Sequence, residues 1–439
     1  MHLDHGSSPF QKYIIINGVN HWFARLSRAV APAEATPVQR RNFTYVQIDA
    51  IGIGMSAAAA TFLPVFLTRL GASNVQVGLL TAMPSITGLA LGVLVGRFLQ
   101  NQRQIVPWFS RARFLAISAY AVTGLVPFLA PEAWVIPVIL AIWAAVTLPQ
   151  IMVNVGFSVV MNAVAGPKLR YELLSRRWSI LGLTTAAAVA AAGQVLDRLD
   201  FPVNYQLTFL ALSAGGLISL TFSSRILIPD TPPAAPAAGQ AWRRRLRDSV
   251  REISRHPDYV AFTAKRFVFL SGLSLGLPLF PLYFVREAQA SDAWIGFINT
   301  AQTFVMVVGY FLWSRASKRR GSRFVLAGTT FGLALYPALV AATHDVRVIA
   351  LLAGLAGIFQ AGLDLVFFDE LMKTVPPERT AIFVALAQSL QYLSGVAAPL
   401  VGTALADQIG LDGALLVSAA LRALGWALFT FTRSAPALP

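Results

Sequence analysis

The two halves of the sequence resemble each other, and both are apolar enough to lie in a membrane. A short pattern returns in the second half at an offset of 217 or 218 residues, with these pairs: Pro64 and Pro281, Arg69 and Arg286, Ser73 and Ser291, Asn74 and Asp292, Gly78 and Gly296. Further along, Asn154 and Asp197 are matched by Asp364 and Asp407 at an offset of 210. A repeat of this length inside apolar sequence is typical of membrane transporters built from two similar halves. The repeat therefore predicts two related bundles of membrane-spanning helices.

The composition agrees with a membrane protein. Of the 439 residues 56% are hydrophobic and only 13% are charged, too few charges to cover a soluble protein of this size. Apolar stretches long enough to cross about 30 Å of hydrocarbon lie at 44–68, 74–96, 114–130, 134–163, 178–197, 205–224, 259–285, 293–314, 324–342, 347–372, 380–406 and 411–432. We therefore predict an all-α integral membrane protein with twelve transmembrane helices in two pseudo-symmetric six-helix bundles.

The net charge of +15 is explained by where the basic residues lie. Of the 35 lysines and arginines, 28 fall in the terminal segments and the loops on the same side, 4 on the opposite side and 3 inside spans. Cytoplasmic loops are the basic ones in membrane proteins. We therefore predict a multi-pass protein of the cell (inner) membrane with both termini cytoplasmic, and no nucleic-acid partner is needed to explain the basicity.

Five segments follow from the same pattern. They are a cytoplasmic N-terminal segment (1–43), an N-terminal six-helix bundle (44–228), a cytoplasmic linker (229–258), a C-terminal six-helix bundle (259–432) and a C-terminal tail (433–439). The run from Phe10 to Val30 indicates either an amphipathic helix on the inner membrane surface or a disordered tail. The linker starts proline-rich and continues basic, which suits a hinge lying against anionic lipids or a solvated connector.

Two loops and one span carry recognisable motifs. The run Trp313 to Arg323 holds Arg319, Gly321 and Arg323 at basic and glycine positions. It is similar to the Asp-Arg-x-Gly-Arg loop of the major facilitator superfamily, with Lys318 in place of that family's Asp. The first copy, Gly96 to Arg103, has lost the Asp and the second Gly, while Gly395 to Asp407 is similar to the family's Gly-Pro-rich eleventh span. The resemblance covers about residues 40 to 432 and implies a fold of twelve helices in two halves. In the family this loop helps to latch the inward-facing gate.

Ionisable residues inside the spans are candidates for coupling and gating, because charges in lipid are costly and usually face a cavity or each other. These candidates are Asp49, Lys265, Arg266 and Asp364. Asp49 and Arg266 occupy matching places in the two halves, so an ion pair of Asp49 with Lys265 or Arg266 would form an inner gate; the alternative is that all three reach the cytoplasmic interface. Asp364 is the predicted proton carrier, and the alternative is a structural ion pair with Lys265, Arg266 or Arg422.

Polar side chains at helical spacing mark the faces that we expect to line a substrate cavity. They are Gln150, Asn154, Asn299, Gln302, Gln360, Gln388 and Tyr392. Hydrogen bonding between helices is the alternative for each amide. Pro278 and Pro281 are expected to break the seventh span, which is tolerated where the freed carbonyls face a cavity.

Enzymatic functions and bound cofactors find no support in the residues. The five histidines lie in tails or loops, cysteine is absent, and no glycine-rich phosphate loop with its lysine occurs, so neither a metal site nor direct use of ATP is expected. The function predicted is secondary active transport of a small solute by alternating access, with coupling to protons, by a monomer in contact with anionic lipids. The alternative is a non-transporting receptor or assembly partner with the same fold.

Overall fold

The computed structural model describes residues 34–228, 255–375 and 380–432, and every regular element among them is a helix. The proposed amphipathic segment from Phe10 to Val30, most of the 229–258 linker and the 433–439 tail lie outside the described residues. In the first half the helices are α2 (Pro37–Arg69), α3 (Asn74–Gln100), α4 (Val106–Leu129), α5 (Glu132–Arg198) and α6 (Val203–Ser223). In the second half they are α8 (Pro257–Gly276), α9 (Leu279–Arg286), α10 (Asp292–Arg320), α11 (Ser322–Ala341), α12 (Val346–Thr374) and α13 (Thr380–Phe431).

Eleven helical segments among the described residues are long and apolar enough to cross a membrane. α5 supplies two of them, because Gly166 has non-helical backbone angles and interrupts it. The last segment, Phe383–Phe431, has 49 residues and is interrupted in the same way at Gly410 (φ 79°, ψ 166°). A backbone with this φ and an extended ψ is open almost only to glycine. The same holds at Gly321 (φ 81°, ψ 165°), the one residue between α10 and α11.

The repeated sequence pattern sets helix beginnings. Ser73 caps α3, accepting a hydrogen bond from the backbone N–H of Gln76 while the Gln76 side chain accepts one from the backbone N–H of Ser73. Its repeat partner Ser291 caps α10 through the N–H of Trp294. The predicted break in the seventh span is confirmed: α8 ends at Gly276 and α9 begins at Leu279, with Pro278 as the residue before it.

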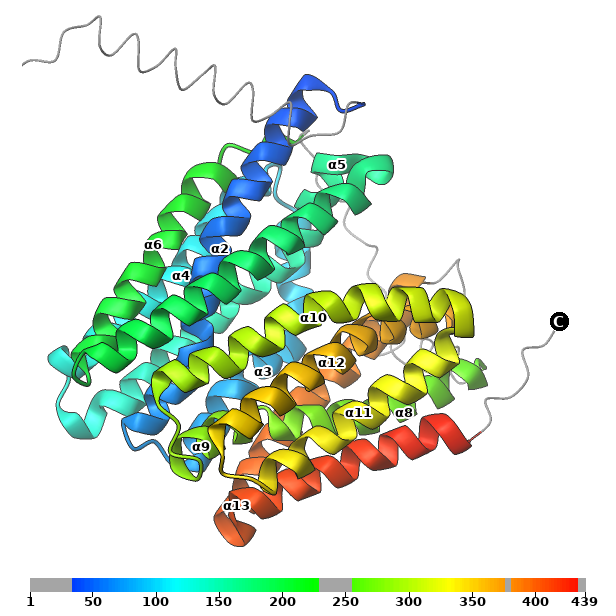
Figure 1. The fold of residues 1–439 in the computed structure, drawn as a ribbon. Helices are drawn as coiled ribbons and strands as arrows, with labels where there is room; N and C mark the ends of the chain where they lie inside the picture. The colour runs from blue at the N-terminus through cyan, green and yellow to red at the C-terminus, as the bar shows by residue number, and fades with distance from the viewer. Residues whose placement is uncertain (1–33, 229–254, 376–379, 433–439) are drawn as a thin grey trace, which may run out of the picture.

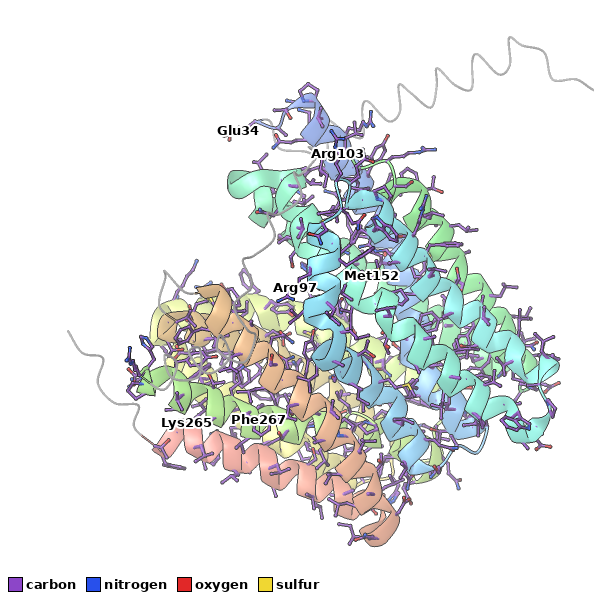
Figure 2. The ribbon with its side chains drawn as sticks, turned by 180° about the vertical axis from the view of Figure 1, so that it is seen from behind. Glu34, Arg97, Arg103, Met152, Lys265 and Phe267 are labelled. Carbon is purple, nitrogen blue, oxygen red and sulfur yellow. The ribbon has the colours of Figure 1, made fainter. Side chains whose placement is uncertain are left out.

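The helices form two groups that meet at one end and diverge toward the other (Figure 1). α2, α4, α5 and α6 lie in the first group, and α8, α10, α11, α12 and much of α13 in the second. Contacts between the groups run through α3 against α13 and α10 against α5. Figure 2 shows the opposite view, in which Arg103 and Lys265 lie toward the diverging ends of the two groups.

The helices extend beyond the apolar stretches at several of their ends. α4 begins at Val106 rather than at residue 114, and a helix follows Gly166 directly in the stretch between the predicted spans 134–163 and 178–197. Polar and basic residues in these extensions therefore lie on helices. This difference matters for the site, because Arg113 and Arg177 are among them.

Candidate functional site

A cavity of about 580 Å³ lies between the two halves. We call it the central cavity. Ala60, Thr61, Pro64 and Val65 of α2 line it on one side, and residues of α8 to α13 line the rest. Three of the predicted cavity residues, Asn299, Gln302 and Gln360, are among its walls, together with Gln391 and Arg422. The side-chain amide of Asn299 also donates to the carbonyl of Ile295 at 2.9 Å, so it contributes to its own helix as well.

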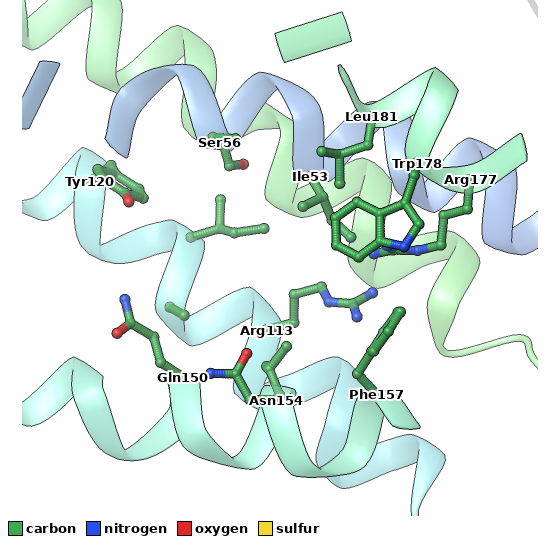
Figure 3. A pocket seen from close by; sticks show the side chains of 14 residues that line it. Ile53, Ser56, Arg113, Tyr120, Gln150, Asn154, Phe157, Arg177, Trp178 and Leu181 are labelled. Carbon is green, nitrogen blue, oxygen red and sulfur yellow. The ribbon is translucent and has the colours of Figure 1, made fainter. Parts of the chain in front are cut away.

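A second cavity, of about 410 Å³, lies within the first half between α2, α4 and α5 (Figure 3). We call it the N-half cavity. Gln150 and Asn154, both predicted from the sequence, point into it from one side in Figure 3. Arg113 and Arg177, which lie outside the spans predicted from the sequence, also line it. Both arginines are 4% exposed, so they are interior residues.

Asp49 is paired inside its own half, and the predicted gate with Lys265 or Arg266 is not formed in this structure. The Oδ2 of Asp49 lies 2.6 Å from Nη1 of Arg113, and Ser219 Oγ donates to Asp49 Oδ1 at 2.6 Å. The Asp49 side chain is fully buried. Sequence reasoning found the acid but missed its partner, because Arg113 precedes the apolar run that marked the third span.

Arg177 has no such partner among the described residues. Its guanidinium lies 4.6 Å from the ring centre of Phe157 and 5.3 Å from that of Trp178, and its buried Nε atom has no hydrogen-bond acceptor. Aromatic faces attract a guanidinium but do not neutralise it. The signal in the sequence was the tryptophan directly after two arginines, which is unusual for a solvated loop.

Lys265 and Arg266, the two basic candidates on α8, make hydrogen bonds to different parts of α13. Lys265 Nζ donates to the carbonyl of Thr432 at 3.1 Å, near the end of α13. Arg266 Nη2 donates to Oε1 of Gln391 at 2.9 Å, and Gln391 lines the central cavity. Arg266 is therefore tied to the wall of the central cavity, whereas Lys265 does not line that cavity.

Asp364 forms hydrogen bonds rather than an ion pair among the described residues. Its Oδ1 accepts from Gln360 Nε2 at 2.8 Å and its Oδ2 accepts from the hydroxyl of Tyr310 at 2.9 Å. The structural alternative, a pair with Lys265, Arg266 or Arg422, is not formed in this structure. Because Gln360 lines the central cavity, Asp364 sits next to its wall on an exposed face of α12.

The remaining predicted residues lie elsewhere. Gln388 is exposed on α13 outside both cavities, and Tyr392 packs closely on Gly88 of α3. Of the loop motif, Arg319 lies in the last turn of α10, Gly321 forms the turn and Arg323 follows in α11. Tyr392 is therefore a contact between the halves rather than a wall of either cavity.

The residues that revealed the repeat connect the two halves at their joined end. Arg69 binds Asp292 (Nη2 to Oδ1, 2.8 Å) and donates to the carbonyl of Ala290 at 3.0 Å. Arg286 makes the corresponding contacts, with Nη1 donating to Oδ1 of Asn74 at 2.6 Å and Nη2 to the carbonyl of Ala72 at 2.5 Å. Each arginine thus reaches the repeat counterpart of the residues that the other one binds. We call Arg69, Asn74, Arg286 and Asp292 the inter-half clamp.

Two further acids extend the clamp. Asp407 accepts from the side-chain amide of Asn74 at 2.7 Å, and Asp197 accepts from the backbone N–H of Ala293 at 3.1 Å. The hydroxyl of Tyr205 donates to Asp292 at 2.8 Å. Asn74, Asp197, Asp292 and Asp407 are all positions that the sequence repeat relates between the two halves, whereas nothing in the repeat points to Tyr205.

The sequence of the second half matches a family model. Residues 266–439 match the Major Facilitator Superfamily. The curated Multidrug resistance protein MdtG of Proteus mirabilis (strain HI4320) is 24% identical over 160 residues, which are 35% of this chain and 39% of that protein. The alignment thus spans well under half the length of this curated relative.

Solved transporter structures share the fold over most of the chain. A mutant of the nucleoside transporter NupG aligns with a TM-score of 0.68 at 12% identity, covering 89% of this chain and all of the other. A bacterial homologue of the iron transporter ferroportin, in an inward-facing state, aligns with a TM-score of 0.64 at 17% identity over 89% of this chain and 98% of the other. The second half of this chain therefore matches the Major Facilitator Superfamily, and nearly its whole length shares the fold of these solved transporters.

Proposed function

We propose that this protein is a secondary active transporter that moves a small solute across the cell membrane by alternating access. The observation that carries the proposal is the inter-half clamp: two reciprocal sets of contacts hold the halves together at one end, and the central cavity lies between the halves. Rocking of two halves about a central site is the usual motion of such folds. The contacts of the clamp lie at one end and provide the gate that this motion must open.

The topology proposed is twelve crossings in two six-helix halves. The 49-residue segment Phe383–Phe431 would be about 70 Å long as one straight helix, more than twice the hydrocarbon thickness. A turn at Gly410 divides it into two crossings. The basic loops then lie at the diverging ends and face the cytoplasm together with both termini, which makes the conformation inward-facing, as in the ferroportin homologue.

Proton coupling is assigned to Asp364. A carboxyl beside the cavity wall that gains and loses contact with water during the cycle changes its proton affinity, which is the property that coupling needs. The hydrogen bonds from Gln360 and Tyr310 link its state to a residue that faces the substrate. Asn299, Gln302, Gln360 and Gln391 supply hydrogen bonds to that substrate.

The test is substrate-dependent flux in proteoliposomes with and without an imposed pH gradient. The expected result is accumulation that follows the gradient and stops when the clamp is cross-linked through cysteines placed at positions 69 and 292; the natural chain has no cysteine to interfere. A protein that binds a solute but carries no flux of it, in either direction, would be a receptor and would refute the proposal.

A further inference from the structure

Arg422, on α13, is a buried cation at the central cavity. It is 2% exposed and lines the cavity wall. Its Nε donates to the carbonyl of Gly272 at 3.3 Å and its Nη1 to the carbonyl of Leu333 at 3.1 Å. These hydrogen bonds fix the direction of the guanidinium, but both acceptors are uncharged backbone carbonyls. Among the described residues Arg422 has no ion pair, and its Nη2 has no hydrogen-bond partner.

Arg266 adds a second positive charge at the same wall. Its only side-chain hydrogen bond in the described part of the chain goes to Gln391, and its Nε is buried without an acceptor. The guanidinium lies 5.7 Å from the ring centre of Phe367, which again offers no full negative charge. The central cavity is therefore bordered by two arginines whose charges the described residues do not neutralise.

Acidic residues are absent from the lining of both cavities described above. The charged residues that line the N-half cavity are Arg113 and Arg177, and the charged residue that lines the central cavity is Arg422. Asp49 forms an ion pair with Arg113, and Asp364 accepts hydrogen bonds from Gln360 and Tyr310. This arrangement disfavours a cationic substrate.

An isolated buried charge is unfavourable unless something pairs with it. A guanidinium binds carboxylate and phosphate groups in a planar, two-pronged geometry that suits these anions better than other partners. An anion that enters the cavity would therefore lower the unfavourable free energy of the buried, unpaired guanidinium of Arg422. Its binding needs no rearrangement of the contacts that hold Arg422.

The rest of the central cavity suits an apolar body. Phe280 stacks on Tyr336 with ring centres 4.9 Å apart, and Leu270, Leu273 and Leu277 line the wall beside them. Cavities of a few hundred cubic ångströms hold molecules of about drug size. We propose that the substrate of the transport function proposed above is a small organic anion with an apolar or aromatic body, whose anionic group binds Arg422 and whose approach Arg266 assists.

The test compares three probes of one shape on the purified full-length protein: benzoate (anionic), benzamide (neutral) and benzylamine (cationic). Binding is measured by titration calorimetry and by the shift of the thermal unfolding midpoint. We expect benzoate to bind at least about tenfold more tightly than benzamide, and benzylamine not to bind, because hydrogen bonds to charged partners are the strong ones. Equal binding of benzamide, preference for benzylamine, or no binding of benzoate would overturn the proposal.

Variants then locate the site. Arg422→Gln should weaken benzoate binding at least about tenfold, and Arg266→Gln by a smaller factor, while the exposed Arg347→Gln is the matched control and should change nothing. If Arg422→Gln does not fold, Arg422→Lys keeps the charge without the planar fork and should lose part of the affinity. Unchanged benzoate binding in a folded Arg422 variant would overturn the assignment.

Flux in proteoliposomes separates this inference from the transport function. Benzoate binding that depends on Arg422, without flux, would keep the anion site and refute transport. Flux of a neutral or cationic solute, with no binding of benzoate, would keep transport and refute the anion site.

Discussion

At the scale of single residues, the most consequential contact is the buried pair of Asp49 and Arg113. Both side chains are almost completely removed from solvent, and Ser219 satisfies a further lone pair of the carboxylate. Removing one partner of a buried ion pair leaves the other charge uncompensated, which costs about 3–5 kcal/mol. The pair therefore locks α2, α4 and α6 to one another within the first half.

Asp49→Asn should accordingly destabilise the protein by about 3–5 kcal/mol, because Arg113 is left without a counter-charge. Thermal unfolding in detergent measures this, with Ser219→Ala as the milder companion at about 1 kcal/mol. A double-mutant cycle should show coupling of Asp49 to Arg113 and none to Arg266. Coupling to Arg266 instead would reinstate the gate that the sequence suggested.

Asp364→Asn should retain substrate exchange and lose gradient-driven accumulation, because asparagine has nearly the same shape and still accepts one of the two hydrogen bonds, but it cannot carry a proton. Counterflow and pH-driven uptake in the same proteoliposomes provide the two measurements. The control is Asp345→Asn, an exposed acid that caps α12. Accumulation with unchanged pH dependence in folded Asp364→Asn would assign the carboxyl a structural role.

At the scale of elements, two single glycines each divide a long helical run into two helices. Gly321 and Gly410 both combine positive φ with extended ψ, and no atom lies within 4 Å of a Cβ built on either. A side chain at either position would have room, so the backbone conformation and not a steric clash with neighbouring residues is what requires glycine. Sequence reasoning placed helix boundaries near both glycines because apolar runs end there, but it could not know that one residue makes the whole turn.

Gly410→Ala should destabilise the protein by about 1–3 kcal/mol, the cost of forcing a side chain into this backbone conformation. Gly92→Ala is the matched control, since Gly92 is helical with open space around it, and alanine should there be neutral or favourable by up to about 1 kcal/mol. Both changes are compared by thermal unfolding. Equal effects of the two would show that the turn tolerates another conformation.

At the scale of the whole molecule, the inter-half clamp selects which end is closed. The first half contributes Arg69 and Asn74 to the clamp, and the second half contributes Arg286 and Asp292. Tyr205 of the first half and Asp407 of the second half add one hydrogen bond each. Much of this architecture could be predicted, because spans and halves depend on apolar length and on a repeat that the sequence shows directly. The pairing of charges could not, because Arg113 and Arg177 sit where helices continue past the apolar runs, and only packing reveals their neighbours.

Asp292→Asn should weaken the clamp and shift the protein toward the state that is open at this end. A single cysteine at Ala60, in the central cavity, reports the change: a membrane-impermeant thiol reagent added from the clamp side should label it faster in the variant. Arg198→Gln, an exposed arginine outside the clamp, is the control. Identical labelling rates with and without Asp292 would show that other contacts hold this end closed.

The reciprocity of the clamp also has a consequence for how the two halves are joined. A half that carries both the arginine and the residues it binds presents a surface complementary to a copy of itself, as in a twofold symmetric dimer. The first half contains six candidate crossings, an even number, so its beginning and end return to one side of the membrane. Two identical halves with this surface fit together as separate chains, and joining them into one chain requires only a connector on that side.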